Sequence, residues 1–156
     1  IKLSRKWQMQ VRVIGEISAF DQDIQESVHA LEEFSSQFDK LHFQLALNYG
    51  SRDEMIRGMR KMAAECQTGK LSPEEITEER FGDYLDTAGL PDPDLMVRTS
   101  GELRLSNFLL WQMAYTEFYF TDTAWPDFDK KELVKAIEQY NKRDRRYGGV
   151  KEEQNV

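Results

Sequence analysis

Strand-like segments alternate with helix-like segments along this chain, and this alternation restricts its fold more than any other feature. Residues 8–14 and 41–47 are rich in alternating apolar side chains, and residues 94–98 contain a short apolar run at 95–97. Such segments are typical of strands. Strands that are separated by helices usually pair in parallel within one sheet. We therefore expect an α/β fold with a largely parallel central sheet and helices on both faces.

Apolar periodicity and capping residues predict the helices between and after these strands. We expect helices over residues 21–38, 51–68, 77–87, 107–114 and 129–145. Ser51 with Glu54, and Ser72 with Glu75, have the spacing of a capping box. Residues 115–121 are more strand-like than helical.

No internal repeat or linker interrupts this pattern. We therefore predict one α/β domain over residues 1–150 and a flexible tail over residues 151–156.

Composition excludes several classes of protein. The net charge is −7, which argues against a general nucleic-acid binder, so we expect no nucleic-acid partner. Cys66 is the only cysteine, so an internal disulfide framework and a cysteine-based zinc site are excluded. A reducing compartment fits this cysteine usage, and we expect a cytoplasmic protein. No apolar run is long enough to cross a bilayer.

Cationic and hydroxyl side chains gather after the strand at residues 94–98. Arg98 ends this strand, and Arg104 and Ser106 precede the expected helix at residues 107–114. Guanidinium groups, a hydroxyl and the N–H groups of a helix start are the donors that bind phosphate and pyrophosphate. These residues indicate an anion site at a strand end.

Each of these side chains also has a structural alternative. Ser106 can be the N-cap of the expected helix without binding a ligand, and either arginine can pair with Glu102 at the surface. Glu117 can be a ligand of Mg²⁺ or a carboxylate that is paired with a neighbour. Asn48, at the end of the strand at residues 41–47, can orient a substrate or form a turn.

Together these residues resemble the signature of the cis-prenyltransferases, the undecaprenyl pyrophosphate synthases. The resemblance rests on residues 98–112 (RTSGELRLSNFLLWQ) with Glu117, and on residues 48–50 (NYG), 119–122 (YFTD), 125–128 (WPDF) and 145–149 (RRYGG). These motifs are long and extend over nearly the whole chain.

The resemblance implies an undecaprenyl pyrophosphate synthase-like fold and a transferase that adds isopentenyl pyrophosphate units to an allylic, farnesyl-type pyrophosphate. The product is a long-chain polyprenyl pyrophosphate. The positions of Arg98, Arg104 and Ser106 match those that hold isopentenyl pyrophosphate, and Glu117 matches a position associated with Mg²⁺. The family's Arg-x-Gly motif, at Arg146 and Gly148, implies a homodimer in which this segment completes the neighbour's substrate site. A long lipid product implies peripheral membrane contact.

One part of the family pattern does not occur here. The motif Asp-Gly-Asn-Gly-Arg-Trp, which carries the catalytic aspartate, is absent, and the first residue is Ile1. We therefore expect a chain that lacks the family's N-terminal third, contains no catalytic residue and is inactive alone. The alternatives are a noncatalytic partner subunit and an inactive fragment.

Overall fold

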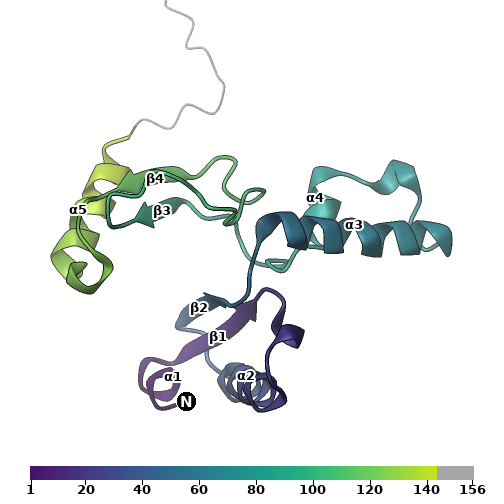
Figure 1. Cartoon of the computed structure of the whole chain (residues 1–156), viewed down its shortest axis with the longest axis horizontal. Coiled ribbons are helices and arrows are strands. Elements are labelled where there is room, and N and C mark those ends of the chain that lie inside the picture. Colours follow the sequence, from purple (N-terminus) through teal and green to yellow (C-terminus); the bar gives the residue numbers. More distant parts are fainter. Residues whose placement is uncertain (144–156) are drawn as a thin grey trace, which may run out of the picture. The chain divides into compact units, whose positions relative to one another are not determined.

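The structure is a computed structural model, and it describes residues 1–143 (Figure 1). The chain forms two compact units. The first comprises Ile1–Pro91 and Leu105–Trp111, and the second comprises Asp92–Arg104 and, among the described residues, 112–143. The single domain predicted over residues 1–150 stays a prediction, and the tail at 151–156 lies outside the described residues.

A two-stranded parallel sheet lies at the centre of one part of the first unit. Strand β1 (Met9–Ile14) pairs with β2 (Leu41–Ala46) in parallel, so that Val11 lies opposite Phe43. Helix α2 (Gln22–Ser35) connects the two strands, after a single turn η1 (Ile17–Ala19), and packs on β1.

Side chains of α2 cover the outer edge of β1. The buried Ser35 hydroxyl accepts a hydrogen bond from Val11 N at 2.9 Å, and Glu32 Oε1 accepts one from Val13 N at 2.7 Å. An uncovered strand edge would leave these N–H groups open to pairing with another chain. Helix α1 (Lys2–Trp7), which the sequence pattern did not predict, also contacts β1.

The first unit also contains a second group of helices. Helix α3 (Ser51–Gln67) packs with the turn η2 (Pro73–Glu75) and the short helix α4 (Glu78–Gly82) (Figure 1). Their buried cluster consists of Met62, Leu71, Phe81 and Leu85, and Trp111 meets Phe81 edge-on with ring centroids 4.8 Å apart. This cluster fixes α3 by burying its inner face.

The second unit contains another pair of parallel strands. Strand β3 (Leu95–Arg98) pairs with β4 (Glu117–Phe120), and Arg98 lies opposite Phe120. A turn η3 (Trp125–Asp127) leads into helix α5 (Lys130–Asn141), which packs on β4 (Figure 1). The Asp129 carboxylate caps α5 by accepting hydrogen bonds from Lys131 N and Glu132 N.

The structure confirms the parallel α/β fold, although each described sheet has only two strands. The prediction of a helix at residues 107–114 is wrong, because these residues form successive turns. The predicted capping box at Ser51 and Glu54 is also wrong: Gly50 is the N-cap of α3, and Glu54 is buried. The capping box at Ser72 and Glu75 is present, but it begins a single 3₁₀ turn.

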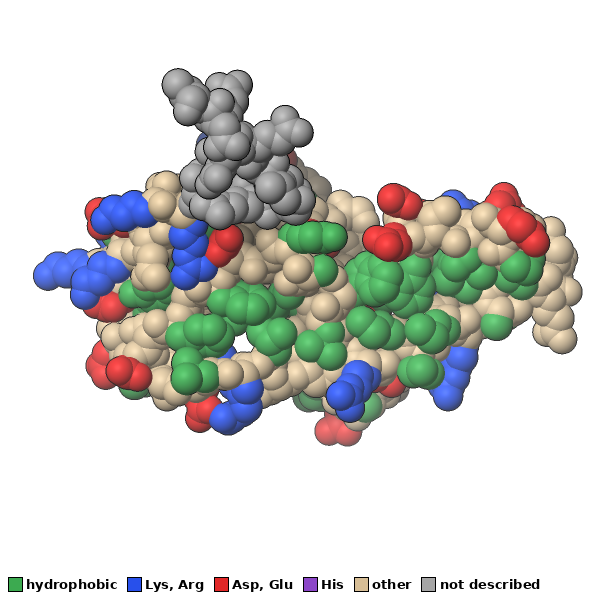
Figure 2. All heavy atoms as spheres, turned by 90° about the horizontal axis from the view of Figure 1, so that it is seen from above, with side chains coloured by type: hydrophobic (Ala, Val, Ile, Leu, Met, Phe, Trp, Pro, Cys, Tyr) green, Lys and Arg blue, Asp and Glu red, His purple; other side chains and the backbone are tan. Residues whose placement is uncertain are grey.

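Several large apolar side chains remain exposed. Leu41, Phe43 and Leu45 of β2 are 39–49% exposed, and Figure 2 shows hydrophobic side chains gathered between charged ones on the face that it presents. Among the residues that the structure describes, no helix combines the length and the apolar character that crossing a membrane requires.

Candidate functional site

Two main-chain hydrogen bonds connect the loop that follows β3 to the residues after β4. Ser100 and Gly101 both have left-handed backbone, with φ of 66° and 69°. Ser100 N donates to Thr123 O at 2.9 Å, and Gly101 N donates to Thr121 O at 3.0 Å. These bonds join the loop to the residues after β4, so the carboxyl end of β3 presents Arg98 on a braced turn.

The structure brings Arg98, the last residue of β3, into contact with Arg104 on this loop. The Arg98 guanidinium donates a hydrogen bond to the main-chain oxygen of Arg104, and the Arg104 guanidinium pairs with the Glu102 carboxylate. The side chain of Arg104 is 65% exposed. An ion pair this exposed contributes little to stability, so an anionic ligand can replace Glu102 as the partner of Arg104.

Ser106 lies in the first unit, in a turn and not at a helix start. Its φ is 52°, and its side chain is exposed. The predicted cradle of helix N–H groups is therefore wrong, and so is the alternative of Ser106 as an N-cap. The hydroxyl itself remains a candidate ligand of an anion, two residues beyond Arg104 in the chain.

Glu117 is the first residue of β4, and its carboxylate is paired. Oε2 accepts a hydrogen bond from Arg143, which also donates to Phe118 O at 2.9 Å. Glu117 N donates to Asp94 O at 3.1 Å, and this bond continues the ladder between β3 and β4. The carboxylate is therefore held in place at the strand start.

Glu117 suits Mg²⁺ only as one ligand among several. Mg²⁺ takes one or two carboxylates and completes its shell with water and substrate phosphates. In residues 1–143, no group of three or more His, Cys, Asp or Glu side chains could hold a metal ion. The carboxylate chemistry of Glu117 fits an ion that is shared with a phosphate, whereas no described set of protein ligands would close a shell alone.

Asn48 has a structural role at the end of β2. Its φ is 45°, and its side-chain amide donates to Glu16 O at 2.9 Å. Its main-chain oxygen accepts from Glu16 N at 3.3 Å. The turn-forming alternative for Asn48 is thus present, and a contact of Asn48 with substrate stays a prediction.

The sequence pattern did not reveal a polar network next to Asn48. Glu54 is fully buried, and its carboxylate accepts hydrogen bonds from the Tyr49 hydroxyl and, at 2.9 Å, from Asp86 N. Arg57 binds the Asp86 carboxylate through two N–H groups, at 2.8 and 2.6 Å. Gly15 N donates to the same carboxylate at 3.1 Å. Asp86 lies 29 residues from Arg57, so no local pattern could identify the pair.

The network shifts the pKa of its members in directions that stabilise the charged pair. Burial raises the pKa of the Asp86 carboxyl, but the hydrogen bonds and charge of Arg57 outweigh this effect, and the pKa lies below its ordinary value. Hydrogen bonds to Asp86 raise the pKa of Arg57. Burial and the bond to Glu54 raise the pKa of the Tyr49 hydroxyl. All these hydrogen bonds join residues within the first unit.

Arg146 and Gly148, which the resemblance implies are substrate-binding residues, lie outside the described residues.

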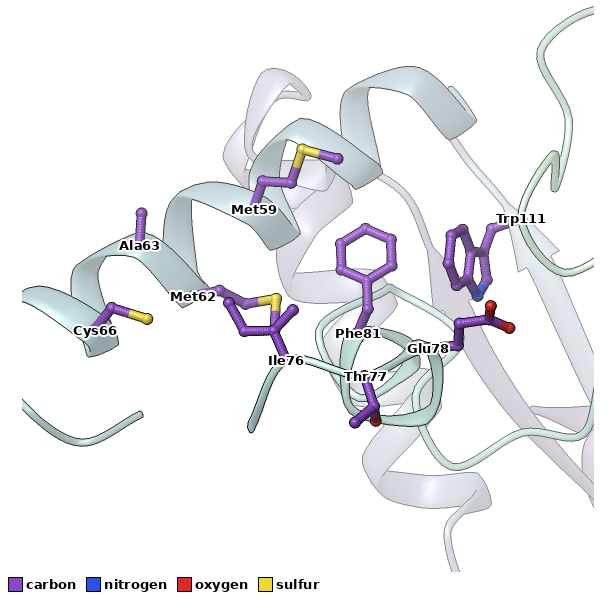
Figure 3. A pocket seen from close by; sticks show the side chains of 9 residues that line it. All are labelled: Met59, Met62, Ala63, Cys66, Ile76, Thr77, Glu78, Phe81 and Trp111. Carbon is purple, nitrogen blue, oxygen red and sulfur yellow. The ribbon is translucent and has the colours of Figure 1, made fainter. Parts of the chain in front are cut away.

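A separate apolar cavity of about 640 Å³ lies in the first unit. Figure 3 shows its lining, in which side chains of α3 face those of α4 and Trp111. The lining includes Met59, Met62, Cys66, Ile76 and Phe81. It contains no cationic side chain, and it does not suit a pyrophosphate.

Comparison with known proteins agrees with this description. A family model described as "Putative undecaprenyl diphosphate synthase" matches residues 1–148. An isoprenyl transferase from Rhizobium meliloti is 50% identical over 142 residues, which are 91% of this chain and 58% of the relative. An isoprenyl transferase from Chlamydia trachomatis is 43% identical over 141 residues, which are 90% of this chain and 56% of the relative. The chain thus spans a little more than half the length of these curated relatives.

Solved structures share the fold. The lavandulyl diphosphate synthase of Lavandula x intermedia, in complex with dimethylallyl diphosphate, has a TM-score of 0.91 and 38% identity, covering 95% of this chain and 64% of that one. A probable undecaprenyl diphosphate synthase from Campylobacter jejuni has a TM-score of 0.80 and 36% identity, covering 93% and 65%. Because the family model spans 148 of 156 residues, this chain belongs to the undecaprenyl diphosphate synthase family of isoprenyl transferases.

Proposed function

We propose that this chain supplies the isopentenyl pyrophosphate site of a cis-prenyltransferase that extends an allylic, farnesyl-type pyrophosphate to a long-chain polyprenyl pyrophosphate. Arg98, Arg104 and Ser106 bind the pyrophosphate of the isopentenyl substrate. One observation carries this proposal. The Arg98 guanidinium contacts the main chain of Arg104 at the carboxyl end of β3, where hydrogen bonds join the loop to the residues after β4. Ligands of parallel α/β sheets bind at such strand ends.

The chemistry explains why a strong cationic clamp is needed. In prenyl transfer, the double bond of isopentenyl pyrophosphate attacks the allylic carbon. A carbon–carbon bond forms, the allylic carbon–oxygen bond breaks, and pyrophosphate leaves with the electron pair while the isopentenyl unit loses a proton. The two pyrophosphates repel each other, so each must be bound separately. Guanidinium groups bind phosphate oxygens through two parallel N–H groups, which fixes orientation as well as distance.

In this proposal Arg104 exchanges its Glu102 partner for the pyrophosphate. The Glu102 pair is exposed, so its loss costs little. The Arg98 guanidinium donates a hydrogen bond to the main-chain oxygen of Arg104, which holds the Arg98 side chain against the segment that carries Arg104. The Ser106 hydroxyl, on a shorter side chain than either arginine, donates a neutral hydrogen bond to the same pyrophosphate.

Glu117 is the residue that we propose as a magnesium ligand. Mg²⁺ neutralises the charge of a departing pyrophosphate. The residues of this chain hold the Glu117 carboxylate through Arg143.

The whole protein's other properties are also proposals. The motif expected to bind the allylic pyrophosphate does not occur in these 156 residues, so we propose that this chain alone binds isopentenyl pyrophosphate without turnover. By the same family resemblance, we propose a homodimer in which Arg146 and Gly148 complete the neighbouring site, a cytoplasmic location and peripheral membrane contact.

The test is a steady-state assay of the full gene product with isopentenyl pyrophosphate, farnesyl pyrophosphate and Mg²⁺. Arg104→Ala should raise KM for isopentenyl pyrophosphate at least tenfold and leave KM for the allylic substrate within about twofold. Arg80→Ala is the matched control, because Arg80 also forms an exposed ion pair, with Asp83 at 3.9 Å. An unchanged KM for isopentenyl pyrophosphate in Arg104→Ala would contradict the proposal.

A further inference from the structure

The turn that contains Ser106 has an unfavourable backbone conformation. Ser106, Asn107 and Leu109 have φ of 52°, 61° and 44°, and none of them is glycine. Residues with a side chain rarely adopt this left-handed region, because Cβ crowds the following carbonyl oxygen. Such a turn persists only where surrounding contacts hold it.

Asn107 provides the strongest of these contacts, at the N-terminus of α3. Its main-chain oxygen accepts a hydrogen bond from Ser51 N at 2.8 Å, and its side-chain Oδ1 accepts one from Arg52 N at 2.9 Å. The first N–H groups of a helix have no partner within the helix. Asn107 therefore acts as a cap from a distant part of the chain and satisfies two of these donors.

Gly50 is adapted to this arrangement. It is the N-cap of α3, where a polar side chain usually accepts the hydrogen bonds. A Cβ at this position would lie 2.9 Å from Nδ2 of Asn107. The φ of Gly50 is −147°, which any residue adopts, so the need for glycine comes from the space that the Asn107 amide occupies.

Two further contacts hold the same turn on α3. The hydroxyl of Ser51, a fully buried residue, accepts a hydrogen bond from Leu110 N at 3.0 Å. Phe108 meets Tyr49 edge-on with ring centroids 5.7 Å apart. Helix α3 is itself anchored by buried Glu54, which binds Asp86 N.

We propose that Asn107 is a positioning residue, whose bonds to the N-terminus of α3 hold Ser106 in the left-handed conformation that its hydroxyl needs to bind the substrate pyrophosphate. Asn107 acts through Ser106 and has no substrate contact of its own. The inference rests on the proposed function, because Ser106 must be a pyrophosphate ligand.

Three substitutions separate two properties of Asn107: its side-chain oxygen acceptor and its tolerance of the left-handed backbone. Asn107→Asp keeps an oxygen acceptor, tolerates the left-handed region and places a negative charge where a helix N-terminus favours it. Asn107→Gly keeps the backbone freedom but removes the side-chain oxygen that accepts from Arg52 N. Asn107→Ala removes the same side-chain oxygen and strains the backbone. We expect kcat/KM for isopentenyl pyrophosphate within about twofold of wild type for Asn107→Asp, and about fivefold to tenfold lower for Asn107→Gly, through KM.

A double-mutant cycle with Ser106→Ala distinguishes positioning from a general structural role. Asn107→Gly should lower kcat/KM in the wild-type background and change it less than twofold in the Ser106→Ala background. An equal loss in both backgrounds would overturn the inference. So would an Asn107→Gly variant with wild-type kinetics when Ser106→Ala is impaired. If Ser106→Ala itself has wild-type kinetics, the proposed role of Ser106 fails, and the positioning role fails with it.

If Asn107→Gly does not fold, Gly50→Ala takes its place in the cycle. Its methyl group displaces the Asn107 amide and leaves the sequence of the turn unchanged. The same dependence on Ser106 is expected, and a loss independent of Ser106 contradicts the inference.

Discussion

Two arginine–carboxylate pairs in this chain have the same chemical groups and opposite surroundings. Arg57 binds Asp86 through two N–H groups, and the side chains are only 22% and 14% exposed. Arg104 binds Glu102, and those side chains are 65% and 40% exposed. The Asp86 carboxylate of the first pair also accepts a hydrogen bond from Gly15 N, directly after β1. The second pair is on a loop at the end of β3.

The difference teaches where to look for a ligand site. Shifted pKa values often mark functional sites, but ion pairs that support the fold shift pKa values too. Here the pKa of Asp86 is lowered, but its carboxylate is already bound by Arg57 and by Gly15 N of the same unit. The exposed pair costs little to break, so its arginine can exchange partners. We therefore base the proposed ligand site on the weakly paired Arg104 beside the end of β3, and not on a shifted pKa.

The largest expected effect comes from the exposed loop. Arg98→Ala should lower kcat/KM for isopentenyl pyrophosphate about 100-fold or more, because it removes charge-assisted bonds to the substrate and the hydrogen bond to the main chain of Arg104. Arg98→Lys should be intermediate, since it keeps the charge but loses the planar fork. Steady-state kinetics measure both, and a thermal unfolding midpoint close to wild type excludes a folding defect. A fully active Arg98→Ala enzyme would remove this loop from the site.

The buried pair should affect stability and not substrate binding. Asp86→Ala leaves the guanidinium of Arg57 without its main partner and should lower the free energy of unfolding by about 3 kcal/mol. Urea unfolding measures this change. A loss below about 1 kcal/mol would mean that the two pairs are energetically alike.

The stability that the buried Asp86 contributes should depend on pH in the acid range. The pKa of Asp86 is lower in the folded chain than its ordinary value of 3.8. Its stabilising contribution is therefore complete above the unfolded pKa and is lost as the pH falls through the lower folded pKa. Between about pH 4 and pH 2, stability should decline less steeply in Asp86→Asn than in wild type. Identical slopes in the two proteins would show that Asp86 does not contribute.

The smallest effect is expected for Glu102→Gln. The exposed pair with Arg104 contributes little, so the free energy of unfolding should change by less than about 1 kcal/mol. Urea unfolding, run beside Asp86→Ala, provides the measurement. A loss as large as that of Asp86→Ala would contradict the distinction between the two regions.

Local sequence patterns were sufficient for much of the fold. Apolar alternation predicted β1 and β2, and the Asp129 carboxylate caps α5 as its position indicates. The pattern failed at residues 107–114, where a run of apolar residues resembles a helix. There Asn107 bonds to α3, 55 residues away from its partner Arg52, and the backbone turns left-handed. Long-range bonds of this kind leave no periodic signal.

The candidate site was predicted in part for the same reason. Arg98 at the end of β3 and Arg104 on the loop after it are close in sequence, so a local pattern was enough to propose them as one group. The roles of Asn107, Glu54 and Asp86 depend on partners that are distant in sequence, at separations of 55 and 32 residues. Glu54 matched a local capping pattern that a tertiary contact with Tyr49 and Asp86 replaces.

Calorimetric titration of isopentenyl pyrophosphate tests the central claim most directly. The claim is that the loop after β3 is the pyrophosphate site. We predict saturable binding to wild type and to Arg80→Ala, and binding at least tenfold weaker to Arg104→Ala. Equal affinity of the three proteins would contradict the claim, because it would show that the exposed arginine of this loop does not bind the substrate.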